Sequence, residues 1–206
     1  MAEIQLRSIS ASAPAKVILH GEHSVVYGKF ALAASIDLRT KVTLKLAKKT
    51  SKVLKVNLLN YSHSLQFGLE SLHGLNYDLK LSETEIDENL KNSLLQMVLD
   101  NCPEQHLNHS EGLVALLYLC SAFFKEAGLD LMPLDITVTS DIPMGAGLGS
   151  SAAFSVALAG ALCHLQNSLK RISCLGEDLN KDLICKWAFK SEKIIHGNPS
   201  GAKKFS

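Results

Sequence analysis

The sequence predicts an α+β fold, and three observations favour it over a doubly wound parallel sheet. Strand-like apolar segments come first, at residues 16–20, 31–46 and 53–59. Segments with helical spacing follow, and one further strand-like segment returns at residues 135–140. Strands and helices gathered in separate runs are typical of an α+β fold. A chain of 206 residues suits one domain with a sizeable core.

The strand predictions rest on alternation and on apolar runs. Residues 16–20 (KVILH) form a compact apolar run that ends at Gly21. From Lys41 onward, residues 31–46 alternate charged or polar side chains with Val42 and Leu44, as a half-buried strand does. Residues 61–81 have a mixed pattern and receive no assignment.

The helix predictions rest on spacing and on end signals. Ser82 and Glu85 form a capping-box pattern before apolar residues with helical spacing at 86–98. A second helix is expected from Ser110 to about residue 127, and an Ala- and Leu-rich third covers 152–165. Residues 167–179 read as a polar connection, and 182–196 as a final helix that ends at Gly197.

Composition excludes several classes of protein. Twenty-one basic and 20 acidic residues give a formal charge of +1, so neither nucleic acid nor a membrane is an expected partner. The longest apolar run, residues 112–124, is too short to span a bilayer. Five irregularly spaced cysteines indicate buried thiols in a reducing compartment and not a zinc site. With no signal-peptide pattern at the N-terminus, a cytoplasmic location is expected.

The glycine-rich stretch at residues 143–153 (PMGAGLGSSAA) lies between the last expected strand and the Ala-rich helix. Glycine lets the backbone approach an anion closely, and the N–H groups of a first helical turn point at it. No lysine completes a P-loop, and Ser150 occupies the third glycine position of a dinucleotide fingerprint. A plain turn with Ser150 or Ser151 as N-cap is the remaining alternative.

Two other stretches accompany the glycine loop, at residues 13–28 (APAKVILHGEHSVVYG) and 194–201 (IIHGNPSG). Together the three resemble the mevalonate kinases, within a wider group of small-metabolite kinases that share the Pro-x-x-x-Gly-Leu-Gly-Ser-Ser loop. The resemblance covers residues 10–201. It implies the N-terminal domain of that fold, a mixed sheet with helices on one side, as a single domain spanning 1–206. It also implies ATP-dependent phosphorylation of mevalonate to 5-phosphomevalonate, an isoprenoid and sterol precursor, and it allows a homodimer.

The resemblance assigns the nucleotide and metal residues. Lys16 would contact the transferring phosphate, although an isolated strand lysine is normally just exposed. Ser151 and Glu192 would bind Mg²⁺, which takes one or two protein oxygens and keeps other ligands from water and phosphate; by spacing alone, Glu192 is equally well a solvated helix residue. The expected ATP-binding residues are Lys16, Asn60, Ser140, Gly145, Ala146, Gly147, Leu148, Gly149, Ser150 and Ser151.

The substrate residues implied by the resemblance are Glu22, His23, Asn198 and Ser200, although His23 by itself reads as a surface-loop histidine. After residues 196–201 the family continues with an apolar residue and an aspartate, the expected general base. Here Lys203 stands in its place, and residues 202–206 diverge. The chain therefore reads as a truncated form without the family's second domain, expected to be inactive. The alternatives are a non-catalytic nucleotide-binding or regulatory isoform, and a related small-metabolite kinase.

Overall fold

The computed structural model describes residues 8–21, 23, 27–48, 50–78, 81–82, 84–102, 110–143, 145–170 and 177–197, with only the backbone at 177–179. Its elements, in chain order, are β1 (Ile9–His20), β2 (Leu32–Leu46), β3 (Val53–Leu58), the 3₁₀ turn η2 (Leu59–Tyr61), β4 (His63–Gly68), α1 (Leu69–His73), α2 (Glu88–Asn101), α3 (Ser110–Glu126), β5 (Leu134–Ser140), α4 (Ser150–Lys170) and α5 (Glu177–His196). The α+β prediction is confirmed.

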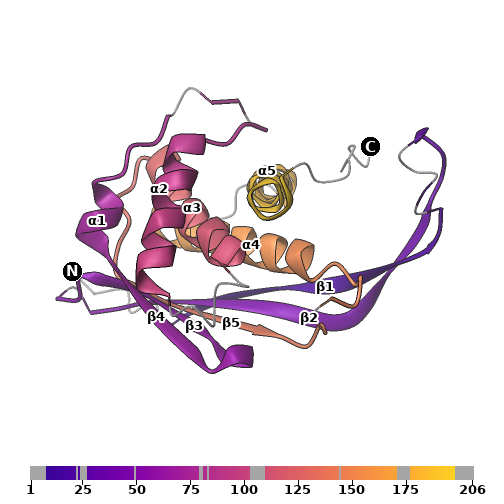
Figure 1. Cartoon of the computed structure of the whole chain (residues 1–206), viewed down its shortest axis with the longest axis horizontal. Helices are drawn as coiled ribbons and strands as arrows, with labels where there is room; N and C mark the ends of the chain where they lie inside the picture. The colour runs from indigo at the N-terminus through magenta and orange to yellow at the C-terminus, as the bar shows by residue number, and fades with distance from the viewer. Residues whose placement is uncertain are drawn as a thin grey trace.

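The strands form one five-stranded mixed sheet in the order β1-β2-β5-β3-β4. Only the β3–β5 pair is parallel; the other pairs are antiparallel. The helices cover one face of this sheet, and α5 packs against α4 and α3 on the side away from the strands (Figure 1). Because β5 is central and α4 follows it directly, the glycine loop lies at one end of the sheet beneath α5.

The core lies between the sheet and the helices. Helix α3 is buried almost all round, including Leu116, Leu117 and Tyr118, which confirms the core helix expected for the long apolar run. Within the described part of the chain, none of the helices combines the length and apolarity needed to cross a membrane. Cys102, Cys120 and Cys163 are buried and Cys185 is exposed, so the described cysteines are mostly buried, as expected.

Strand β1 is longer than predicted, because it begins at Ile9 rather than at Lys16. The missed half is rich in alanine and serine, which have little intrinsic preference for strands. Tertiary packing explains their presence: Ala13 and Ala15 are buried, and a Cβ on Gly160 of α4 would lie 3.3 Å from Cβ of Ala11. Small side chains on both elements let α4 pack closely against the strand.

The start predicted for the helix after residue 82 is wrong. Glu85 does accept a hydrogen bond from the Ser82 N–H at 2.9 Å, but this closes only a turn. Helix α2 begins at Glu88, because the Asp87 carboxylate accepts from the N–H groups of Asn89 and Leu90, both at 3.0 Å, and so acts as the N-cap.

Two further segments differ from the sequence analysis. The expected polar connection at 167–179 is shorter, since α4 continues to Lys170 and α5 already begins at Glu177. The unassigned region after residue 61 contains β4 and the short helix α1. Polar residues on exposed helix faces account for the first difference, because they weaken an apolar period without ending the helix.

Candidate functional site

The glycine loop between β5 and α4 has an alternating backbone. Gly145, Gly147 and Gly149 have φ angles of +70°, +68° and +70°, whereas Ala146 and Leu148 between them keep negative φ. Alternation of this kind turns successive N–H groups toward one side and forms a concave anion-binding nest. A Cβ on Gly145 or Gly147 would meet no atom within 4 Å, so these positions need glycine for conformation and not for space.

The loop leads straight into the first turn of α4. The N–H of Ala153 donates to the carbonyl of Gly149 at 3.0 Å, so Gly149 occupies the N-cap position. The alternative in which Ser150 or Ser151 caps the helix is therefore wrong, because both lie inside the first turn. A glycine cap brings no side chain to accept from the first-turn amides, which suits an anion held at this helix end.

Lys16 lies against this loop. Its backbone N–H donates to the Leu148 carbonyl at 3.0 Å, and a Cβ on Gly149 would be 3.1 Å from Cγ of Lys16. The β1–β2 register shifts at Pro14/Ala15, immediately before Lys16, and such irregularities commonly re-aim a side chain. The structure thus joins two stretches more than a hundred residues apart, and it places an exposed ammonium group beside the nest.

A polar seam joins α4 and α5, and we define it as Ser151, Ser155, Ser191, Glu192 and His196. At the open end, Nε2 of His196 and Oγ of Ser151 are 2.9 Å apart. One turn further in, Ser155 is hydrogen-bonded to Oγ of Ser191 at 2.8 Å and to Oε1 of Glu192 at 3.3 Å. Ser155 and Ser191 are fully buried. The two residues expected to bind a metal, Ser151 and Glu192, therefore share one seam.

Asn60 and Ser140 are also brought together. The Asn60 amide donates to the Ser140 carbonyl at 2.7 Å and accepts from the Ser140 N–H at 2.8 Å. The Ser140 hydroxyl is 2.8 Å from that of the buried Thr40. This pair of hydrogen bonds between a side chain and the backbone ties η2 to the end of β5, so Asn60 shapes the site largely by fixing the backbone.

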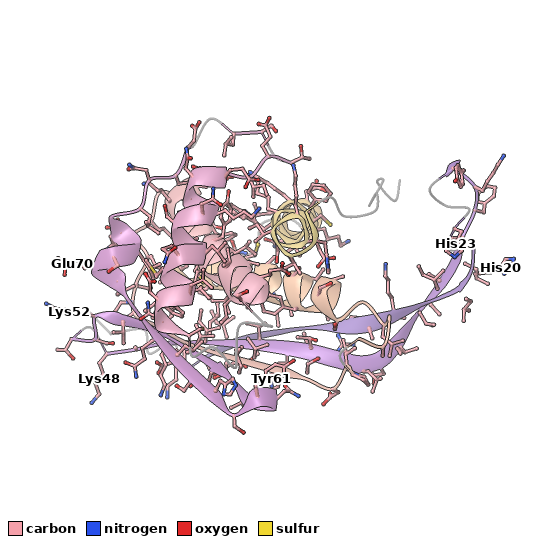
Figure 2. All side chains as sticks on the ribbon, in the orientation of Figure 1. His20, His23, Lys48, Lys52, Tyr61 and Glu70 are labelled. Atoms are coloured by element: carbon pink, nitrogen blue, oxygen red, sulfur yellow. The ribbon has the colours of Figure 1, made fainter. Side chains whose placement is uncertain are left out.

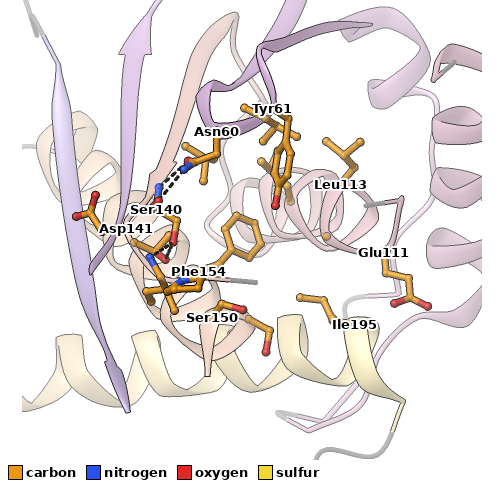
Figure 3. Close-up of a pocket in the computed structure, with 17 residues that line it drawn as sticks. Asn60, Tyr61, Glu111, Leu113, Ser140, Asp141, Ser150, Phe154 and Ile195 are labelled. Atoms are coloured by element: carbon orange, nitrogen blue, oxygen red, sulfur yellow. Dashed lines mark hydrogen bonds between the residues drawn. The ribbon is translucent and has the colours of Figure 1, made fainter. Parts of the chain in front are cut away.

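A cavity of about 510 Å³ opens between these groups, within the usual size range of small-ligand sites (Figure 3). Its lining joins an apolar wall to polar groups at the glycine-loop end, and consists of Thr40, Leu58, Asn60, Tyr61, Glu111, Gly112, Leu113, Leu116, Val138, Ser140, Asp141, Ile142, Pro143, Ser150, Ser151, Phe154 and Ile195. Figure 3 shows the rings of Tyr61 and Phe154 directed into the same space. Burial raises the pKa of the Tyr61 phenol.

The aromatic wall was missed by the sequence analysis. Phe154 was counted as part of a core helix, and Tyr61 fell in the unassigned stretch. The only signal for Phe154 was its place three residues after Ser151, which puts both on one face of the first helical turns. Nothing in the local sequence of Tyr61 marks it as part of a cavity.

Of the expected substrate residues the structure describes only His23, which is not brought to this cavity. His23 is exposed and lies at the far end of the β1–β2 ribbon, away from the helices (Figure 2). Glu22, Asn198, Ser200 and Lys203 lie outside the described residues. Over the described ranges, no three His, Cys, Asp or Glu side chains gather into a metal-binding cluster. Because the structure describes only His23 among the four substrate residues, the substrate assignments stay predictions.

Comparison with known proteins finds a family match that includes the glycine loop and α4. Residues 114–203 match the GHMP kinases N terminal domain. The mouse and human mevalonate kinases are 39% and 40% identical to the chain over 201 and 202 residues. The chain is similar to about half of each of these mevalonate kinases.

Coverage and structure define this likeness further. The alignments cover 94% and 92% of this chain but only 50% and 49% of the mouse and human mevalonate kinases, so the chain spans about half the length of these relatives. The crystal structure of the Methanococcus jannaschii mevalonate kinase matches the fold with a TM-score of 0.60 at 24% identity, over 92% of this chain and 47% of that one. The chain therefore shares its fold with the matching part of that structure.

Proposed function

We propose that this chain supplies the nucleotide-binding half of an ATP-dependent kinase that phosphorylates mevalonate to 5-phosphomevalonate. The observation that carries the proposal is that three features adjoin: an apolar cavity whose lining includes Pro143 and Ser150, the glycine nest between these two residues, and Lys16 beside the nest. Phosphoryl transfer depends mainly on positioned phosphates and on neutralised charge, and these features provide both. The choice of mevalonate rests on the likeness to the mevalonate kinases.

The cavity suits the base of the nucleotide. A planar aromatic ring gains most from apolar walls and aromatic neighbours, which Tyr61 and Phe154 supply. The phosphates would then extend toward Ser150 and the loop, where backbone N–H groups face the anion. Lys16 would hold the transferring phosphate, because its ammonium is exposed and its side chain lies along Gly149.

Mg²⁺ fits the donor set of the polar seam. Ser151 and Glu192 offer a hydroxyl and a carboxylate oxygen, the hard ligands that this cation prefers, and both are only partly buried. When bound, Mg²⁺ would neutralise charge on the phosphate oxygens. Glu22, His23, Asn198 and Ser200 are proposed to bind mevalonate.

Titration with a fluorescent ATP analogue tests the nucleotide site. The chain should bind the analogue in the presence of Mg²⁺, and Ser151→Ala should weaken binding. A coupled assay for ADP, with and without mevalonate, tests the reaction in the complete gene product. Failure of the chain to bind the nucleotide would refute the nucleotide site; binding with ADP release that does not depend on mevalonate would refute the substrate.

A further inference from the structure

We infer that the contact between α4 and α5 sets the geometry of the metal-binding pair through two hydrogen bonds one helical turn apart, which makes His196 on α5 and Ser155 on α4 positioning residues for Ser151 and Glu192. This inference rests on the proposed function and goes beyond it, since the resemblance gave no role to either residue. It assigns one purpose to the polar seam, which is otherwise an exception inside an apolar helix pair.

The buried serines need an explanation. Ser155 and Ser191 are fully buried between α4 and α5, among residues such as Ala157, Leu158 and Ile194. Alanine would fill these positions without the cost of burying a hydroxyl. Their hydroxyls are instead linked to each other and, through Ser155, to Oε1 of Glu192.

The number of hydroxyl protons limits which of these groups can donate. Ser155 has one hydroxyl proton, and a carboxylate can only accept. The Ser155 hydroxyl is the donor in both contacts, to Oγ of Ser191 at 2.8 Å and to Oε1 of Glu192 at 3.3 Å, so its one proton is shared between these two acceptors. Donation to one oxygen of Glu192 fixes the carboxylate rotamer and leaves the second oxygen for another partner. A half-buried carboxylate held in this way keeps one orientation.

His196 acts on Ser151 in a comparable way. With Nε2 as acceptor, the Ser151 proton points at the imidazole, and both lone pairs of Oγ remain for other partners. Without the histidine, the hydroxyl is free to rotate and can point its proton toward a cation. Partners that orient metal ligands typically change metal affinity by ~10–100-fold when they are removed.

The test measures how much Mg²⁺ tightens nucleotide binding, by titrating the full chain with a fluorescent ATP analogue in Mg²⁺ and in EDTA. His196→Ala and Ser155→Ala should each lower the tightening ratio by ~10-fold and leave the affinity in EDTA unchanged. His196→Gln places an amide near the position of Nε2 and should keep most of the ratio. Exposed residues of α4 with the same side chains provide controls, and His164→Ala and Ser168→Ala should match the unaltered chain.

Other outcomes distinguish failure of the positioning role from failure of the proposed function. If Ser151→Ala loses the Mg²⁺ effect while His196→Ala and Ser155→Ala keep it, the positioning role is refuted and the proposed function stands. If either variant weakens binding equally in Mg²⁺ and in EDTA, the residue is structural, which also refutes the inference. If the unaltered chain binds no nucleotide, the proposed function fails and the inference with it. Fluorescence of Trp187, the single tryptophan, reports on the folding of α5 in every variant.

Discussion

Replacing Gly149 with alanine should damage the site in a way that replacing Gly147 does not. The two glycines have nearly equal φ angles, +70° and +68°, so both variants force alanine into the same left-handed conformation. They differ in what the new methyl group meets. At Gly147 there is open space, whereas at Gly149 the methyl would be 3.1 Å from Cγ and 3.4 Å from Cε of Lys16.

The shared strain can be estimated. A left-handed conformation costs a non-glycine residue roughly 1–2 kcal/mol. Alanine also reduces the freedom of the unfolded chain, which returns about 0.4–1 kcal/mol. Each variant should therefore lose about 1 kcal/mol of unfolding free energy, or about 2–4 °C in Tm for a domain of this size. In Gly149→Ala, Lys16 must additionally move by a few tenths of an ångström away from the loop.

Gly128 provides the control for strain outside the site. It has a φ of +67° with open space for a Cβ, and it follows α3, on the other side of β5 along the chain from the loop. Denaturant unfolding followed by Trp187 fluorescence should give similar losses for all three alanine variants. Affinity for the ATP analogue should be unchanged in Gly128→Ala, weaker in Gly147→Ala and weakest in Gly149→Ala. Equal affinities in the two loop variants would refute the role given to the contact with Lys16.

Three more predictions concern stability and reactivity. Asn60→Ala should cost about 0.5–1.5 kcal/mol of unfolding free energy, because two exposed hydrogen bonds to the Ser140 backbone are lost and water replaces them in part. An unchanged denaturation midpoint would contradict this. At about pH 8 a thiol reagent should modify exposed Cys185 in the native chain and spare Cys120 and Cys163, because burial raises the pKa of each of these two thiols to about 12. The ordinary pKa of these thiols is 9.0, so above that pH the unfolded chain loses their protons while the native chain keeps them. The unfolding free energy should therefore fall as the pH rises from 9.0 toward about 12, which denaturation at several alkaline pH values measures.

Local patterns predicted much of the fold because they report local physics. Alternation in β2 and the apolar period of α3 follow directly from which face is buried. The start of α2 shows the limit of such patterns. Ser82 and Asp87 both offer an N-cap, and only the remainder of the fold decides between them. The Asp87 carboxylate also accepts the N–H of Asp78 and the Asp87 N–H donates to the buried Tyr118 hydroxyl, which holds that residue in place.

The sequence by itself determined the chemistry available to this protein: a glycine alternation that permits left-handed backbone, a strand lysine, and a serine and a glutamate able to bind a cation. Only the tertiary structure decided that these groups meet. Lys16 reaches Gly149 because β1 lies beside the start of α4, and Glu192 shares a seam with Ser151 because α5 packs on α4. The aromatic cavity wall likewise exists only after η2 is tied to β5. Such contacts depend on packing between distant segments, which no local pattern in the chain encodes.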